Sequence, residues 1–418
     1  MICRSNAFIK GFILIFLLSL SSNIHAQASF EDSQLFTTKS LSFESALLNG
    51  ERKIQVYLPK SYALGERKYP VIYVLDSDFL FHQAVSISSV RSSRDLMPES
   101  IIVGISNPTN QQRFALAMPI KREIDGNLSF KNGKPEIFLD FFAKELFPFI
   151  EKKFRTANHR TVVGMSPTAG AVMTSYLNRP DLFDAYVAIA SDPHFFNING
   201  ELLADKFIKS VAKNNDKRKK WLYFSRGELD TPHNPNIIDV FNKLDKGFAE
   251  SKSNHIAKAE IIKEGEHYES SLLSFINAFK LIYPVNVWRP NYRSYRDVEN
   301  PEMELAAFYK QLSKEYGFKA YPTVTGYWMG NSVTGLARHF GRKKEYQKAI
   351  NLLKWGLSSF PESVAIHEGL TNVFEEFGDK KSALKHAEIV YKLAKEQASP
   401  HLDYFSERIK QLTNQNKM

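Results

Sequence analysis

The feature that most constrains the fold is a series of short, continuous apolar runs separated by longer stretches. The runs span Pro70 to Leu75, Ile101 to Ile105, Thr161 to Val163, Ala185 to Ala190 and Trp221 to Phe224. Several of the stretches between them have helical spacing. Unbroken apolar runs that alternate with helices are typical of parallel strands buried on both faces. The chain is therefore predicted to form an α/β fold, with a mostly parallel sheet and helices on both of its faces.

Two other patterns extend this prediction. Residues 37–58 alternate in polarity around Asn49-Gly50, which predicts an antiparallel hairpin at the N-terminal edge of the sheet. Apolar residues from Ile137 to Ile150 recur at helical spacing, which predicts a helix over one sheet face. Another helix is predicted from Pro167 to Asn178, directly after the third apolar run. A strand therefore passes into a helix with almost no loop at Gly164-Met165-Ser166.

The alternation stops after Tyr283, and the rest of the chain has helical patterns. Phe340 and Phe374 are 34 residues apart, as are Ala349 and Ala383, and this period is typical of tetratricopeptide repeats. Two units are fewer than the roughly three that such repeats need, so residues 302–316 or the preceding domain must cap them. The predicted organisation is a signal peptide (1–26), an α/β-hydrolase domain (27–287), a linker (288–301) and a helical domain (302–418). These helices are expected to cover the hydrolase, to self-associate or to bind a protein partner.

The N-terminus has the layout of a secretory signal peptide. Arg4 and Lys10 precede and flank an apolar stretch from Gly11 to Leu20, and Ala26 ends the polar run that follows. Cleavage after Ala26 would place the mature chain in the periplasm or outside the cell. The stretch is shorter than the roughly 20 apolar residues of a membrane-spanning helix, so no membrane span is expected after processing. The single cysteine, Cys3, lies in the removed segment, so neither a disulfide nor a thiol nucleophile is expected.

Charge and motifs indicate which partners and cofactors to expect. The formal net charge of +10 favours anionic partners, but export argues against nucleic acid, and Lys217 to Lys220 is interpreted as a solvated loop. The sequence Glu266-His267-Tyr268-Glu269 lacks the two histidines, one helical turn apart, of a helical zinc site. A phosphate-binding glycine loop is also missing. We therefore expect neither a metal nor another cofactor.

The strand-to-helix junction at Ser166 has the context of a nucleophile elbow. Asp230 follows the strand that begins at Trp221, and His267 comes later in the chain. The order serine, acid, histidine is that of the α/β-hydrolase triad. His267 would take the proton of Ser166, and Asp230 would orient the imidazole, with Glu228 as the rival acid. Each residue alone is also explained as an ordinary turn, cap or loop residue, so the prediction depends on their order and position.

Motifs along nearly the whole chain after residue 26 carry a resemblance to a known family. They are Tyr69 to Asp76, Val103-Gly104-Ile105 with Arg113, Phe138 to Phe141 with Glu145 to Pro148, Arg179 to Ala185, and Leu312 to Gly317. Together they resemble the esterase family that includes esterase D and the siderophore esterases, in the subgroup with C-terminal tetratricopeptide helices. The resemblance implies a small-molecule ester substrate and a triad of Ser166, His267 and either Asp230 or Glu228. It also implies that the backbone at Ser77 and Asp78 lines the oxyanion hole and that His194 lies at the pocket wall.

The elbow departs from the family pattern Gly-x-Ser-x-Gly-Gly, because this chain has Pro167 and Thr168 after Ser166. Proline has no backbone N–H, and the residue after the nucleophile normally donates one to the oxyanion. Losing one such donor costs roughly 2.7 to 4 kcal/mol of transition-state stabilisation. Pro167 also predicts an extended backbone at Ser166, in conflict with a strained elbow.

Two interpretations follow from this departure. In the first, the Thr168 hydroxyl or another backbone N–H replaces the missing donor, and the chain is a serine-dependent carboxylic ester hydrolase that forms an acyl-serine intermediate. In the second, the site is impaired, and the chain is a binding or scaffold protein that uses its helical repeats. Acyl transfer to an acceptor other than water is a third hypothesis on the same triad.

Overall fold

The computed structural model describes residues 38–417 except 125–126, 132, 214–217, 232–235 and 327–329. The predicted signal peptide lies outside these residues. The central sheet has eight strands in the order β1-β2-β4-β3-β7-β8-β10-β11. Their bounds are β1 Thr38–Ser45, β2 Gly50–Tyr57, β3 Tyr69–Leu75, β4 Ile101–Ile105, β7 Thr156–Met165, β8 Ala185–Ile189, β10 Trp221–Gly227 and β11 Ile256–Ile262.

Strands β4 to β11 of this sheet pair in parallel, whereas β1 and β2 form an antiparallel edge. The hairpin between β1 and β2 turns at Asn49, whose φ of 51° lies in the left-handed region that asparagine tolerates. Ser45 pairs with Gly50 across the turn. The predicted mostly parallel sheet with an antiparallel N-terminal edge is therefore confirmed.

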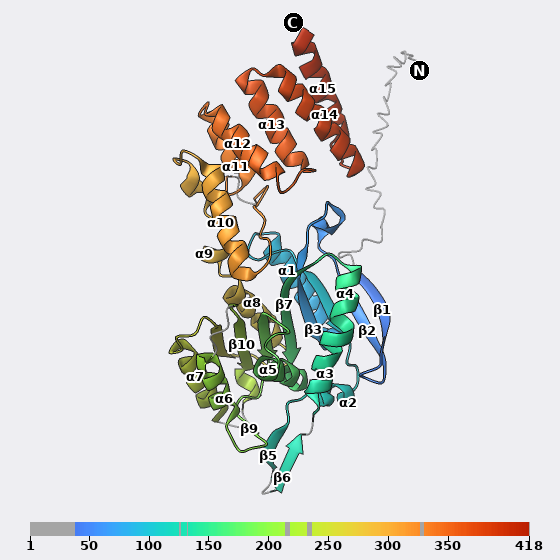
Figure 1. Ribbon diagram of the computed structural model, residues 1–418, viewed down its shortest axis with the longest axis vertical. Coiled ribbons are helices and arrows are strands. Elements are labelled where there is room, and N and C mark those ends of the chain that lie inside the picture. The colour runs from blue at the N-terminus through green and yellow to red at the C-terminus, as the bar shows by residue number, and fades with distance from the viewer. Residues whose placement is uncertain are drawn as a thin grey trace, which may run out of the picture. The chain divides into compact units, whose positions relative to one another are not determined.

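Helices cover both faces of the sheet (Figure 1). Alternate residues of β3 point to opposite faces: Ile72 packs with helices α1 (Ser77–Ser92) and α8 (Ser270–Ile282). Tyr73 belongs to the buried cluster on the other face, which includes residues of α3 (Pro135–Phe141), α4 (Phe147–Lys153), α5 (Ala169–Asn178), α6 (Leu203–Lys213) and α7 (Asn236–Ala249). Every residue of β3 is buried, as expected for a strand covered on both sides.

Several elements differ from the sequence prediction. The helix predicted from Ile137 to Ile150 is divided into α3, a π-helical turn (Phe142–Leu146) and α4. Strand β11 was not predicted. A second sheet, also not predicted, has the order β6-β5-β9, with β5 Ile120–Ile124, β6 Asn127–Lys131 and β9 Phe196–Asn197. The short helix α2 (Asn110–Ala115) precedes it.

The C-terminal region is helical, as predicted. It comprises α10 Pro301–Tyr316, α11 Val333–Arg342, α12 Tyr346–Leu357, α13 Val364–Phe377, α14 Lys380–Glu396 and α15 Leu402–Lys417. Phe340 on α11 and Phe374 on α13 are both buried, as are Ala349 on α12 and Ala383 on α14. The four residues used to infer the 34-residue period thus occupy equivalent helices, and the assignment to tetratricopeptide repeats stays a prediction.

One buried cluster runs from the sheet into these helices. The rings of Trp221 in β10 and Tyr316 in α10 stack with centroids 4.9 Å apart. The segment predicted as a linker is also packed: α9 (Val285–Trp288) leads into it, and Tyr292 in the following 3₁₀ turn is fully buried and shares a 2.9 Å hydrogen bond with the hydroxyl of Tyr309. Residues 288–320 therefore connect the two regions through their core.

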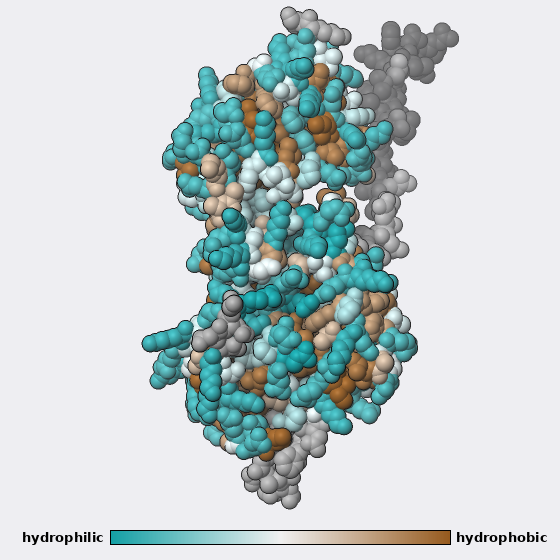
Figure 2. Space-filling model, viewed as in Figure 1, coloured by the Kyte–Doolittle hydropathy of each residue, from teal (hydrophilic) through white to brown (hydrophobic). Residues whose placement is uncertain are grey.

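The face of the molecule shown in Figure 2 is mostly hydrophilic, with apolar residues in small groups between the charged ones. Within the part of the chain that the structure describes, no helix combines the length and hydropathy needed to cross a bilayer. Interaction through the C-terminal helices, with a partner or between copies, stays a prediction.

Candidate active site

The predicted site residues follow the carboxyl ends of the parallel strands. Asp76 follows β3, Ser166 follows β7, Asp230 lies in the turn after β10, and His267 follows β11. Because parallel strands end at the same edge of a sheet, these residues share one edge, which is where ligands bind in open α/β sheets.

Ser166 has a strained backbone at the start of a 3₁₀ turn that leads into α5. Its φ is 57°, in the left-handed region. The extended conformation expected from Pro167 is therefore wrong. A close approach supports the sharp turn, since a Cβ added at Gly164 would lie 2.6 Å from the Thr168 carbonyl oxygen. The surrounding hydrogen bonds outweigh the local preference of a residue that precedes proline.

Thr168 and Asp76 supply those hydrogen bonds. The Thr168 hydroxyl donates to Asp76 Oδ2 at 2.7 Å. The Thr168 hydroxyl oxygen also accepts from the backbone N–H of Met165 at 2.8 Å. Thr168 is fully buried. Because a hydroxyl has one proton, this geometry corrects the expectation that Thr168 replaces the missing oxyanion donor. Its side chain instead ties the elbow to the end of β3.

Asp76 is a buried carboxylate held by an arginine. Its φ is 56°, and its side chain accepts from Arg113 Nε at 3.1 Å and from Arg113 Nη2 at 3.3 Å. Burial raises the pKa of Asp76 to about 6, although Arg113 and the Thr168 hydroxyl act in the opposite direction. The sequence placed both residues in motifs but gave no role to either.

His267 pairs with Asp230. The distance from His267 Nδ1 to Asp230 Oδ2 is 2.6 Å, so the other ring nitrogen, Nε2, faces away from the acid. Glu228 Oε2 instead accepts from the backbone N–H of Glu264 at 2.8 Å. The geometry thus distinguishes the two rival acids and pairs the imidazole with Asp230.

Arg226 connects this pair to the neighbouring loop, a role that the sequence analysis missed. Its Nη2 lies 3.1 Å from Asp230 Oδ2, and its Nη1 donates to Asp192 Oδ1 at 2.6 Å. The guanidinium is mostly buried, which strengthens such ion pairs. Arg226 therefore holds Asp230 in place, and Asp230 in turn orients the imidazole of His267.

The loop that carries His267 packs against α1, near the elbow. The Tyr268 ring lies 5.9 Å from that of Phe79, and the Ser271 hydroxyl donates to Gln83 Oε1 at 2.7 Å. Helix α1 begins next to Asp76, which is bonded to the elbow. Among the described residues, no hydrogen bond joins Ser166 Oγ to His267. In other enzymes of this type, catalytic hydrogen bonds are often long until substrate binds.

A small cavity lies beside Ser166. It is also lined by Ala117, Met118, Pro167, Gly170, Met173, Asp192 and Leu203. His194, predicted at the pocket wall, does not line this cavity; its ring packs on Phe195 with centroids 4.1 Å apart. Asp192, two residues earlier, takes that place.

The predicted oxyanion residues lie in the first turn of α1. Ser77 is buried. The carboxylate of Asp78 accepts from the Ser106 hydroxyl at 2.6 Å and from the Asn107 backbone N–H at 3.0 Å. Both residues adjoin Asp76, so the start of this helix is anchored on two sides. No group of three or more potential metal ligands occurs within the described ranges.

Comparisons with known proteins agree on the family and fold. The family model described as "Putative esterase" matches residues 45–271. Ferri-bacillibactin esterase BesA of Bacillus subtilis is 28% identical over 194 residues, which cover 42% of this chain and 66% of that protein. An uncharacterised protein of the same organism, YbbA, is 24% identical over 35% of this chain and 60% of its own length. The chain thus spans less than two thirds of these relatives.

Solved structures resemble this chain in fold. An uncharacterised protein from Capnocytophaga ochracea aligns over 90% of this chain and 100% of its own, with a TM-score of 0.57 and 19% identity. An IroE-like serine hydrolase from Shewanella oneidensis aligns over 77% of this chain and 99% of its own, with a TM-score of 0.57 and 22% identity.

Proposed function

Because the chain belongs to this esterase family, we propose that it hydrolyses carboxylic esters through an acyl group carried on Ser166. The observation that carries the proposal is the 2.6 Å hydrogen bond between His267 and Asp230, at the sheet edge where Ser166 occupies a left-handed elbow. Nucleophilic acyl transfer requires a serine and a histidine oriented by a carboxylate, and Ser166 and the His267–Asp230 pair share this edge of the sheet.

The first half of the reaction forms the acyl-serine. His267 Nε2 takes the proton of Ser166 Oγ as this oxygen attacks the ester carbonyl carbon. The tetrahedral intermediate then breaks the bond to the alcohol oxygen, which leaves with the proton from His267. Asp230 keeps the imidazole in the tautomer with the proton on Nδ1 and stabilises the charged ring. Arg226 holds Asp230 in place.

The second half releases the acid. Water enters, His267 removes one of its protons, and the remaining hydroxide attacks the acyl carbon. Collapse of the second tetrahedral intermediate breaks the bond to Ser166 Oγ, which recovers its proton from His267. The products are a carboxylic acid and an alcohol.

The oxyanion is expected to receive its main hydrogen bond from the backbone at the start of α1, at Ser77. The N-terminus of a helix favours negative charge because its first N–H groups have no partner within the helix. Pro167 has no N–H to offer, and Thr168 has already used its hydroxyl proton. We therefore expect a slower acylation step than in a serine hydrolase with two backbone donors.

The cavity beside Ser166 measures only about 20 Å³, with Asp192 at one wall, so it holds little more than a water-sized part of a substrate. One relative is named for its action on ferri-bacillibactin, so siderophore-type esters are natural first candidates for the substrate. Short aliphatic esters are the matched alternative.

The test is hydrolysis of a panel of p-nitrophenyl esters of increasing chain length by the full chain and by Ser166→Ala. We expect the substitution to lower kcat by at least about 10⁴-fold and to abolish labelling by a fluorophosphonate. Ser358→Ala, at an exposed site on the C-terminal helices, is the control and should behave as wild type. Full activity in Ser166→Ala would exclude the acyl-serine, and an unlabelled wild type without activity would favour a binding protein.

A further inference from the structure

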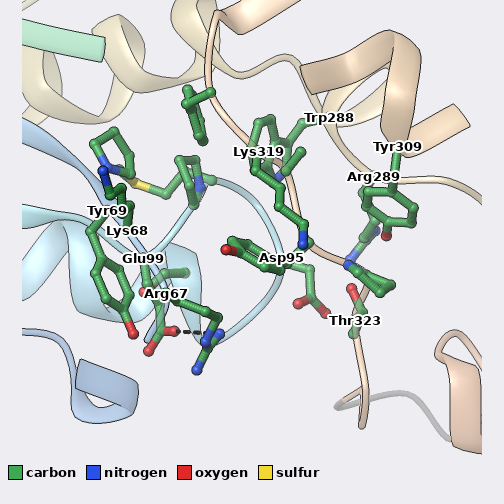
Figure 3. A pocket seen from close by; sticks show the side chains of 18 of the residues that line it. Arg67, Lys68, Tyr69, Asp95, Glu99, Trp288, Arg289, Tyr309, Lys319 and Thr323 are labelled. Atoms are coloured by element: carbon green, nitrogen blue, oxygen red, sulfur yellow. Dashed lines mark ion pairs between the residues drawn. The ribbon is translucent and has the colours of Figure 1, made fainter. Parts of the chain in front are cut away.

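A second cavity, of about 150 Å³, lies at the opposite edge of the sheet from Ser166. Its walls come from the loops before β3 and β4 and from the C-terminal region (Figure 3). Tyr69 opens β3 at this cavity, whereas Leu75 ends β3 at the proposed active site. A strand rises about 3.3 Å per residue, so the two sites are about 20 Å apart. The cavity shares no lining residue with the one beside Ser166.

Aromatic side chains form much of its wall. They are Tyr69, Trp288, Tyr309, Phe318, Tyr321 and Phe360. An apolar cavity of about 150 Å³ in another protein binds benzene, so this volume admits one aromatic ring. Aromatic walls favour such a ring through edge-to-face and offset contacts.

Arg67 lies within this wall and has an unused capacity to donate hydrogen bonds. Its side chain is 19% exposed, and its guanidinium carbon lies 4.9 Å from the ring centre of Phe360 and 5.7 Å from that of Tyr321. Its nearest acid is Glu99, at 3.8 Å, beyond hydrogen-bond distance. Among the described residues, the guanidinium donates no hydrogen bond, so its donors are available to a bound ligand.

The surrounding charges favour an anion. Arg67, Lys68, Arg289 and Lys319 line the cavity together with two acids, Asp95 and Glu99. Glu99 is paired with Arg67 at 3.8 Å and also accepts from the Ser61 hydroxyl, and Asp95 interacts with Thr323 and Arg289, so two of the four cations have no acid of the cavity assigned to them. Figure 3 shows Arg67 and Glu99 on one side of the cavity and Arg289 and Trp288 on the other. The lining thus carries an excess of positive charge.

We propose that this cavity binds a small aromatic carboxylate, with its carboxylate on Arg67 and its ring between the aromatic side chains. A carboxylate offers two oxygens that match the parallel donors of a guanidinium. The ring supplies the apolar body that the aromatic wall requires. Because the cavity joins sheet loops to the C-terminal region, the ligand holds these two parts together. This inference is independent of the proposed ester hydrolysis.

The test is calorimetric titration of the full chain with benzoate and with its neutral analogue, benzamide. We expect benzoate to bind and benzamide to bind at least about tenfold more weakly, because only benzoate supplies an anion to Arg67. Cyclohexanecarboxylate should also bind more weakly than benzoate, since it keeps the charge but lacks the flat ring. Equal binding of benzoate and benzamide, or no binding of benzoate, would overturn the proposal.

Three variants locate the binding site. Arg67→Gln should weaken benzoate by at least about tenfold, whereas Arg338→Gln, at an exposed arginine outside the cavity, should leave it unchanged. Ser166→Ala should also bind normally, which separates this cavity from the proposed active site. Unchanged binding by Arg67→Gln with a native circular dichroism spectrum would contradict the assignment. Phe360→Leu, which removes one aromatic ring from the wall, provides a second test if Arg67→Gln fails to fold, and it should bind benzoate several-fold more weakly.

Discussion

Two arginines of similar exposure lie beyond the two ends of β3. Arg113, with a side chain 17% exposed, donates two hydrogen bonds to Asp76 at the carboxyl end of the strand. Arg67, with a side chain 19% exposed, lies beyond the other end, between aromatic rings and at 3.8 Å from its nearest acid. At the first end the charges are fixed to one another, which orients a reactive site in advance. At the second end Arg67 has one ion pair, with Glu99, and donates no hydrogen bond within the described residues, which suits recognition of a ligand.

The largest effect on catalysis is expected from the hydrogen bond between Asp230 and His267, the proposed general base. Asp230→Asn should lower kcat by about 10⁴-fold, because an amide favours the wrong tautomer of His267. Glu228→Gln should retain nearly full activity, since Glu228 contacts the backbone of Glu264 and not the imidazole. Steady-state kinetics on a p-nitrophenyl ester would measure both. Equal losses in the two variants would show that this pairing does not control the chemistry.

A gain of activity is expected from a substitution at Pro167, the residue after Ser166. Pro167→Ala restores a backbone N–H after Ser166 and should raise kcat by up to about 10²–10³-fold, the effect of one oxyanion donor. Pro148→Ala, on the surface of α4, is the control. Ser166 already has its left-handed backbone, so the new N–H needs no change of the turn. An unchanged kcat in Pro167→Ala would mean that another group already supplies the second donor.

A smaller effect is expected on stability. The pKa of Asp76 is raised from 3.8 in the unfolded chain to about 6 in the folded protein. Between these values the folded state holds a proton that the unfolded state has lost, so stability falls as the pH rises through this window. A shift of about two units corresponds to about 3 kcal/mol.

Asp76→Asn removes this titration and suits the left-handed backbone. Urea unfolding from pH 4 to 7 should therefore show wild type losing up to about 3 kcal/mol relative to the variant. Parallel stability curves for the two proteins would contradict the assigned pKa. Asp239→Asn, at an exposed site on α7, is the control and should behave as wild type.

The sequence predicts the buried part of the sheet well. Strand β4 has the predicted bounds, and the hairpin turns at Asn49 as expected, because apolar runs and turn residues report local structure directly. Strand β11 was missed because it lies at the edge of the sheet, where most of its residues are only partly buried and an apolar run is not needed. The π-helical turn within 135–153 leaves no mark on apolar spacing either.

In the candidate active site, too, some features could be predicted from the sequence and others could not. The order of Ser166, Asp230 and His267 and their places after strands could be predicted from sequence. The backbone of Ser166 could not, because the local preference set by Pro167 is overridden by Thr168 and Asp76, 92 positions apart. Arg226 and Asp192 are also linked only by the fold. Arg67 is a further case, since the ring of Phe360 that it contacts lies far along the chain.

The stacking of Trp221 on Tyr316 has a consequence for biosynthesis. His159, buried near the start of strand β7, likewise shares a hydrogen bond with the carbonyl of Tyr316 through Nδ1 at 3.1 Å. A nascent chain that ended at residue 287 would leave this indole and this imidazole facing water. The sheet therefore reaches its final packing only after α10 has been translated. A fragment that stops before that helix would expose an aggregation-prone aromatic surface to chaperones and proteases.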